Sequence, residues 1–161
     1  MQQIIAALLS NFTLTFLILG VLATAISMAR HRGGGDTRVR KGHSRRGHFA
    51  EAAIAFYCLF AIGLTFFTNF VMHVFFGTVA ASYIGWAQSP FQAEVGWASL
   101  GFAAVGLLAY REGFEMRLAA VLGPACFLLG AAIGHVVQMV TAHNFAPGNA
   151  GIIFWTDIIV P

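Results

Sequence analysis

Apolar residues in this chain come in four long runs separated by shorter polar stretches. The runs cover approximately residues 4–28, 50–80, 93–110 and 118–142. A helix rises 1.5 Å per residue, so about 20 apolar residues cross a hydrocarbon core of about 30 Å, and each run is close to that length or longer. The pattern predicts an all-α fold, a polytopic membrane protein in which four transmembrane helices form a bundle.

Composition supports a membrane environment. Hydrophobic residues make up 58% of the chain and charged residues 9%, whereas soluble domains carry roughly 25% charged residues. Outside the runs remain a basic loop at 29–49, two short connections and a tail at 143–161. We therefore expect a single membrane domain over residues 1–161, and no motif marks the chain as an enzyme.

Positive charge gathers on one side of the predicted bundle. Seven of the nine Lys and Arg residues lie between the first two runs, and the other two, Arg111 and Arg117, flank the turn between the third and fourth. The positive-inside rule places both connections in the cytoplasm, so both termini are predicted to face outward. Trp86, Trp97 and Trp155 fall near the outward helix ends, where aromatic belts form.

The basic loop at 29–49 suggests contact with anionic lipid headgroups, worth about 1 kcal/mol per basic residue near the surface. Nucleic acid is the alternative partner for such a loop. No aromatic residue is interleaved among the basic ones to stack on bases. We therefore expect lipid contact and no nucleic-acid binding.

Apart from Glu51 at the inner end of the second run, strongly polar side chains within the runs are few, and they fall in the half of the bundle that is predicted to face outward. Such groups are costly in lipid when unpaired, so they tend to face the bundle interior and to mark a site. Asn69 and His73 are four residues apart, and His135 and Gln138 three apart, so each pair shares a helix face. The remaining ones are Asn11 in the first run and Glu94 at the start of the third.

The first hypothesis is a site for a metal or other cation. His73, Glu94 and His135 would be the ligands, and Asn69 and Gln138 would support them. Two imidazoles and one carboxylate suit zinc, iron or copper. No HxxxH or ExxH spacing is present, so the convergence of these residues depends on helix packing alone.

Two other functions remain open. His73 and His135 could hold a quinone headgroup or a haem in a redox-linked subunit. Alternatively, the polar groups could serve only helix packing in a structural or accessory subunit, either in a homo-oligomer or in a larger membrane complex.

The tail after the fourth run begins with a turn-rich stretch at 144–151 and ends with an apolar segment at 152–161. The segment is too short to span a bilayer, so we expect it along the outer interface, folded over the mouth of the bundle. Gly148 and Gly151 would allow the reversal. Asp157 would then reach the polar cluster and take part in binding, or face water.

In the second half of the chain, the stretches at 91–96, 134–135 and 147–151, together with Asp157, resemble an uncharacterised family of small bacterial membrane proteins with four predicted helices. More distantly, the chain's architecture is similar to that of the DoxX-like membrane proteins, some of which are associated with redox enzymes. The resemblance implies a multi-pass protein of the bacterial cytoplasmic (inner) membrane, offers no established activity, and singles out Glu94, His135 and Asp157.

Overall fold

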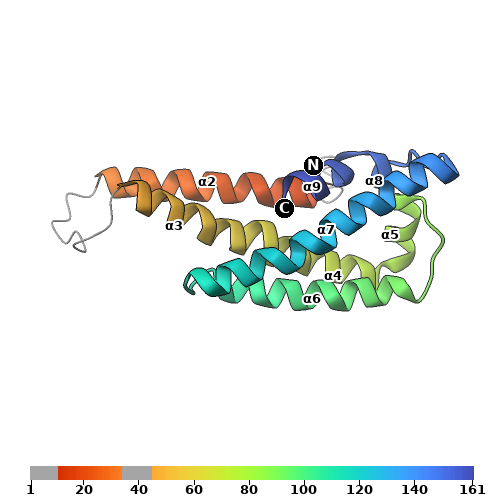
Figure 1. Cartoon of the computed structure of the whole chain (residues 1–161), viewed down its shortest axis with the longest axis horizontal. Coiled ribbons are helices and arrows are strands. Elements are labelled where there is room, and N and C mark those ends of the chain that lie inside the picture. Colours follow the sequence, from red (N-terminus) through yellow and green to blue (C-terminus); the bar gives the residue numbers. More distant parts are fainter. Residues whose placement is uncertain (1–10, 34–44) are drawn as a thin grey trace.

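A computed structural model describes residues 11–33 and 45–161. Their regular structure is helical throughout, and Figure 1 shows the long helices lying side by side as an elongated bundle. The helices are α2 (Phe12–Gly33), α3 (Arg45–Tyr57), the π-helix η1 (Cys58–Leu64), α4 (Thr65–Phe75), α5 (Gly77–Ile84), α6 (Phe91–Ala109), α7 (Phe114–Ala142), α8 (Pro147–Ala150) and α9 (Ile152–Ile159).

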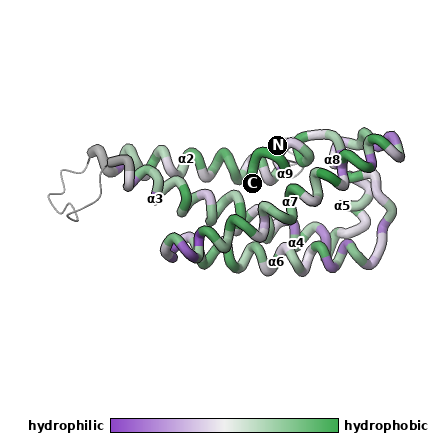
Figure 2. Tube along the Cα trace, viewed as in Figure 1, coloured by the Kyte–Doolittle hydropathy of each residue, from purple (hydrophilic) through white to green (hydrophobic). Residues whose placement is uncertain are grey.

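Four stretches of helix are long and apolar enough to cross a membrane: Phe12–Arg30, Gly47–Phe75, Phe91–Ala109 and Phe114–Ala142. They correspond to the four predicted runs, so the prediction of an all-α, multi-pass membrane protein is confirmed. Figure 2 shows hydrophobic residues along most of these helices and hydrophilic ones concentrated near their ends. Large apolar side chains are exposed along the bundle surface, as expected of a surface that faces lipid.

The second span differs from the run predicted at 50–80. It is continuous through α3, η1 and α4 but ends at Phe75, and α5 starts in a new direction. Phe76 takes a non-helical conformation, with φ −125° and ψ 31°. The continuous helix Arg45–Phe75 has as many residues as the predicted run, because it both begins and ends five residues earlier.

The loop expected at 29–49 is shorter than predicted. Helix α2 continues to Gly33 and α3 begins at Arg45, because Arg is a good helix former once it lies beyond the hydrocarbon. Hydropathy marks only the apolar part of such a helix. Much of the basic cluster expected to touch lipid headgroups, including Arg38, Arg40 and Lys41, lies outside the described residues.

The core is built around η1. Phe66 is fully buried and makes edge-to-face ring contacts with Phe102 of α6 and Phe127 of α7. Gly106 of α6 lies directly on η1, since a Cβ atom there would be 2.7 Å from the Gly63 nitrogen. Glycine at this point lets the two backbones approach closely, as small residues do between membrane helices.

At one end of the bundle, α4 and α7 stop, α6 starts and the C-terminal tail turns back. We call this the tail end. Helix α8 packs against α5, and α9 runs back beside α7 and α2. The Tyr57 hydroxyl donates a hydrogen bond to the Val160 carbonyl. The tail was expected along the interface over the mouth. It instead descends between the helices, and its last turn reaches the residue at which α3 gives way to η1.

Candidate functional site

A cluster of buried polar side chains lies against α7, about 10 Å from the C-terminal end of that helix. It centres on His135, which is 5% exposed. The imidazole Nδ1 lies 2.7 Å from Asn149 Oδ1 of α8. Its Nε2 lies 3.5 Å from Asp157 Oδ2 of α9. The site therefore depends on the tail, which supplies both partners of the histidine.

Asn149 is fully buried and uses both ends of its amide. Its Nδ2 donates to the backbone carbonyls of His135 (3.3 Å) and Asn144 (2.9 Å). Its Oδ1 accepts a hydrogen bond of 3.1 Å from the Trp86 indole and faces His135 Nδ1. The Trp86 ring also packs on the imidazole, with ring centroids 5.6 Å apart.

These contacts determine the histidine tautomer. Because the Asn149 amide nitrogen is committed to two carbonyls, its oxygen faces the imidazole, and an oxygen can only accept. His135 Nδ1 therefore carries a hydrogen. The remaining ring nitrogen, Nε2, is left to share a proton with the carboxyl group of Asp157.

Asp157 is 5% exposed and occupies the inward face of α9 together with Thr156. Burial raises the pKa of Asp157, because the charged carboxylate loses its hydration, and the hydrogen bond with His135 opposes that rise. The sequence left open whether Asp157 reaches the polar cluster or faces water. In the structure it contacts His135 of the cluster.

Local sequence explains how the tail reaches this position. Helix α7 ends at His143, whose left-handed conformation (φ 50°) turns the chain. Pro147 opens α8 at a position where a missing N–H is harmless. A Cβ atom on Gly148 would be 2.6 Å from the Tyr83 ring, and one on Gly151 would be 2.3 Å from the Pro147 carbonyl oxygen. The two glycines thus allow the chain to reverse, because a side chain at either position would clash with a neighbouring residue.

A second polar group lies at the tail end, between α4 and α6. His73 Nδ1 is 3.2 Å from Gln92 Oε1, and Gln92 Nε2 donates to the Gly77 carbonyl at 3.3 Å. One helical turn deeper, Asn69 donates to the Ser99 hydroxyl at 2.9 Å. Asn69 and His73 therefore share a helix face, as predicted, but each has its own partner on α6.

The structure does not bring the predicted metal ligands together. Among the described residues, no group of three or more His, Cys, Asp or Glu side chains is placed to hold a metal ion. His73 pairs with Gln92, and His135 with Asn149 and Asp157.

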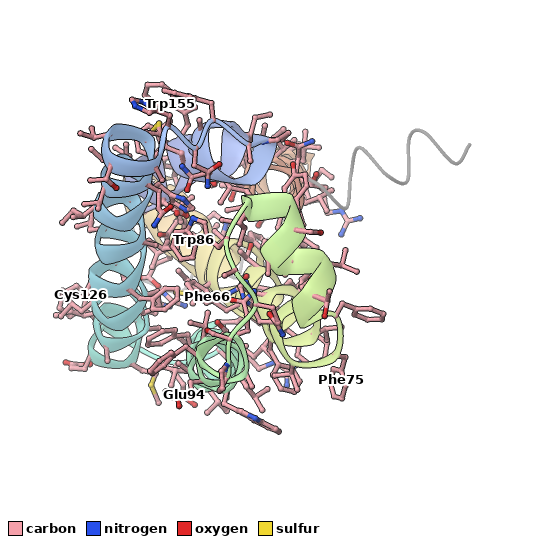
Figure 3. The ribbon with its side chains drawn as sticks, turned by 90° about the vertical axis from the view of Figure 1, so that its right-hand side faces the viewer. Phe66, Phe75, Trp86, Glu94, Cys126 and Trp155 are labelled. Atoms are coloured by element: carbon pink, nitrogen blue, oxygen red, sulfur yellow. The ribbon has the colours of Figure 1, made fainter. Side chains whose placement is uncertain are left out.

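The other predicted members of the site also lie apart from His135. Glu94 is exposed in the first turn of α6, and Figure 3, which views the bundle from its tail end, shows it across the bundle from Trp155 of the tail. The Gln138 side chain makes no hydrogen bond with another described residue; its backbone carbonyl accepts from the amide of Asn144. The arrangement gives the three-ligand metal site no support.

A haem held by His73 and His135 is also unsupported, because His135 has no ring nitrogen available for the iron. Both ring nitrogens of His135 face tail residues, and ligation of iron would displace Asp157.

Sequence reasoning missed Asn149, Trp86 and Gln92. Asn149 lies in a turn-rich stretch, where asparagine is common for local backbone reasons. Gln92 and Trp86 lie near predicted helix ends, where polar and aromatic residues are ordinary. Their amide side chains could have marked Asn149 and Gln92 as candidate site residues, because both lie close to apolar segments. Gln92 precedes the run at 93–110 by one residue, and Asn149 precedes the segment at 152–161 by three.

Comparison with known proteins places this arrangement in a family. Residues 10–161 match the Family of unknown function (DUF6790). The chain belongs to this family. The match covers every described helix and both polar groups, so the predicted resemblance to an uncharacterised family is confirmed, while the likeness to DoxX-like proteins stays a prediction. No curated protein and no solved structure matches the chain.

Proposed function

We propose that this small multi-pass membrane protein binds and releases a proton at the His135–Asp157 pair. The observation that carries the proposal is the geometry of the pair: two buried heteroatoms, Nε2 and Oδ2, face each other at 3.5 Å. A structural or catalytic metal ion takes three or four protein ligands, whereas a proton needs only two heteroatoms.

The pair has two forms of equal net charge. With the proton on Nε2, an imidazolium faces a carboxylate. With the proton on Oδ2, a carboxylic acid donates to a neutral imidazole. Asn149 keeps the hydrogen on Nδ1 in both forms, so the exchanging proton is confined to the side that faces α9. Loss of this proton leaves a carboxylate facing a lone pair in a buried site, which is unfavourable.

Exchange with water requires movement of the tail, because His135 and Asp157 are each 5% exposed. Trp86 covers the imidazole from the α5–α6 connection, and α9 covers the carboxyl group. Proton binding is therefore coupled to the position of α9. Such coupling is what a proton-linked subunit of a membrane complex requires.

The proposal includes the orientation predicted from the positive-inside rule. Both termini face away from the cytoplasm of a bacterial inner membrane, so the pair exchanges protons with the outer side. Positive charge at Arg111, Arg117 and the basic segment supports this orientation.

A structural or accessory role is the second candidate, favoured by one observation. Every polar atom of the Asn149 side chain is used within the protein, as expected of a fastening for the tail. A homo-oligomer or a larger membrane complex is the setting we expect for either role.

Two spectroscopic titrations of the full chain in lipid nanodiscs test the proposal. Nitrogen-15 NMR of the histidines follows protonation at Nδ1 and Nε2 of His135, and infrared difference spectra follow the carboxyl group. We expect Nδ1 to stay protonated, Nε2 to titrate, and a carboxylic acid band that is absent from Asp157→Asn. If Nε2 and the carboxyl band stay constant across the range in which imidazole and carboxyl groups titrate, the site only fastens the tail.

A further inference from the structure

A cavity of about 470 Å³ lies at the tail end, apart from the His135–Asp157 pair. It forms where α4 stops and α5 turns away, and the segment leading into α6 closes its other side. Its volume falls within the range of small-molecule sites, roughly 300–1,000 Å³. The lining residues include His73, Phe75, Thr78, Gln88, Ser89 and Pro90.

Gln92 fixes the hydrogen-bonding character of His73. Its Nε2 donates to the Gly77 carbonyl, which turns Oε1 toward His73 Nδ1. An amide oxygen only accepts, so Nδ1 carries the hydrogen, and Nε2 of the neutral imidazole is an acceptor. No described residue bonds to this Nε2, and it is not among the buried, unpaired polar atoms. The cavity therefore presents an accessible acceptor of fixed orientation.

The rest of the lining is polar but uncharged. Thr78, Gln88 and Ser89 contribute two hydroxyls and an amide, and none of the three side chains bonds to another described residue. No Lys, Arg, Asp or Glu lines the cavity. A charged phosphate or carboxylate would find no opposite charge there, so the lining favours a neutral, hydrogen-bonding ligand.

Depth and surroundings indicate that the ligand has an apolar part. His73 is two residues from the end of its membrane span at Phe75, hence about 3 Å inside it. Phe75 lines the cavity and is 66% exposed, and Figure 3 shows its ring pointing away from the bundle. Phe76 and Phe91 are also exposed beside the mouth. An acyl or isoprenoid tail could leave the cavity along these rings into lipid.

We infer that this cavity binds the hydroxyl-bearing head of a neutral membrane amphiphile, and that His73 Nε2 accepts the hydroxyl hydrogen. The fixed acceptor discriminates between hydroxyl and carbonyl heads, because a carbonyl oxygen facing Nε2 would place two acceptors together. A hydroquinone head therefore fits and its oxidised quinone does not. A sugar or glycerol head offers the same hydroxyl chemistry.

Binding to the full chain in phosphatidylcholine nanodiscs tests this inference, since that lipid carries no hydroxyl in its head. The probes are a decyl hydroquinone kept reduced, the corresponding decyl quinone, and decyl glucoside. The readouts are retention of each probe and the nitrogen-15 resonance of His73 Nε2. We expect saturable retention of a hydroxyl probe with a shift of Nε2, and no such shift with the quinone.

Two variants show that the retained probe is in the cavity. His73→Phe is expected to weaken retention about five-fold, the effect of one hydrogen bond. Gln88→Ala removes an exposed side chain without a protein partner, so it keeps the fold and is expected to weaken retention about two-fold. His143→Asn, at an exposed histidine outside the cavity, and Asp157→Asn, in the proton pair, are expected to leave it unchanged.

The probes that are retained decide between the possible heads. Retention of the hydroquinone alone identifies a quinol-type head, and retention of the glucoside as well identifies a general hydroxyl site; both support the inference. Equal binding of quinone and hydroquinone, retention unaffected by both His73→Phe and Gln88→Ala, or no retention of either hydroxyl probe would overturn it.

Discussion

A single buried amide, that of Asn149, sets the protonation pattern of its neighbours. It receives hydrogen bonds from Trp86 and His135 and gives two to backbone carbonyls. An amide has a fixed donor end and a fixed acceptor end, so it imposes direction on every partner. Gln92 does the same for His73 at the cavity. In both places an amide oxygen holds the hydrogen on Nδ1 of a histidine, and Nε2 then faces Asp157 in His135 and has no partner among the described residues in His73.

We predict that Asn149→Ala destabilises the protein by about 3 kcal/mol, because several partners would be left unpaired in a buried site. Reversible unfolding in mixed micelles measures the loss. Asn69→Ala is the matched control, since Asn69 is a partly buried amide that donates one hydrogen bond, to the Ser99 hydroxyl, and a loss of about 1 kcal/mol is expected there. Equal losses for the two variants would show that the Asn149 network adds nothing beyond a single bond.

At the scale of elements, the tail carries one partner of the proposed proton site, Asp157. Helix α9 is held by Asp157 against His135 and by the Val160 carbonyl against Tyr57. The ionisable side chain that faces Asp157 from α7 is His135; α8 and residues 12–29 of α2 carry none. Docking of α9 therefore follows the protonation of one pair.

We predict that docking of α9 weakens as pH rises. The pKa of Asp157 is raised by burial, so the contribution of this group to docking is fully present below the ordinary aspartic acid pKa and is lost as pH rises through the raised value. A spin label at the exposed Ile159 reports docking as immobilisation.

Two variants serve as controls for the pH dependence. Asp157→Asn is neutral at every pH, so its docking is expected to stay constant. Tyr57→Phe loses one hydrogen bond to Val160, which weakens docking by about 1 kcal/mol and leaves its pH dependence in place. A pH dependence that survives in Asp157→Asn would assign the effect to another group.

At the scale of the whole molecule, four apolar spans describe a multi-pass membrane protein. Arg117 bonds to the Ala109 carbonyl and pairs with Glu51 at the end opposite the tail. These contacts join the ends of α3, α6 and α7 on the side predicted to be cytoplasmic.

We predict the orientation from the positive-inside rule. In a Cys58→Ala/Cys126→Ala background, a cysteine replacing Gln88 is expected to react with membrane-impermeant reagents in intact cells. A cysteine replacing Gly113, in the turn between α6 and α7, is expected to react only with permeant ones. The opposite pattern would invert the topology, and equal labelling of both positions would indicate mixed insertion.

The sequence by itself determined the class of the protein and its spans, because the need to satisfy backbone hydrogen bonds in lipid ties long apolar runs to helices. It also marked His135 and Asp157 as polar residues of interest. Helix ends were less well predicted, as at Phe76 and Arg45, because hydropathy reports where lipid ends and the backbone can continue or turn beyond that point.

Only the tertiary structure decided which polar residues meet. His73, Glu94 and His135 were expected together because they lie at similar depth, but depth fixes a residue along a helix axis and leaves its rotation about that axis open. Rotation follows from packing, here from close contacts such as Gly106 on η1 and Gly148 on α5. The descent of the tail then supplied Asn149 and Asp157 to His135, because a short apolar segment that carries a carboxyl group is satisfied only where another chain segment offers it a partner.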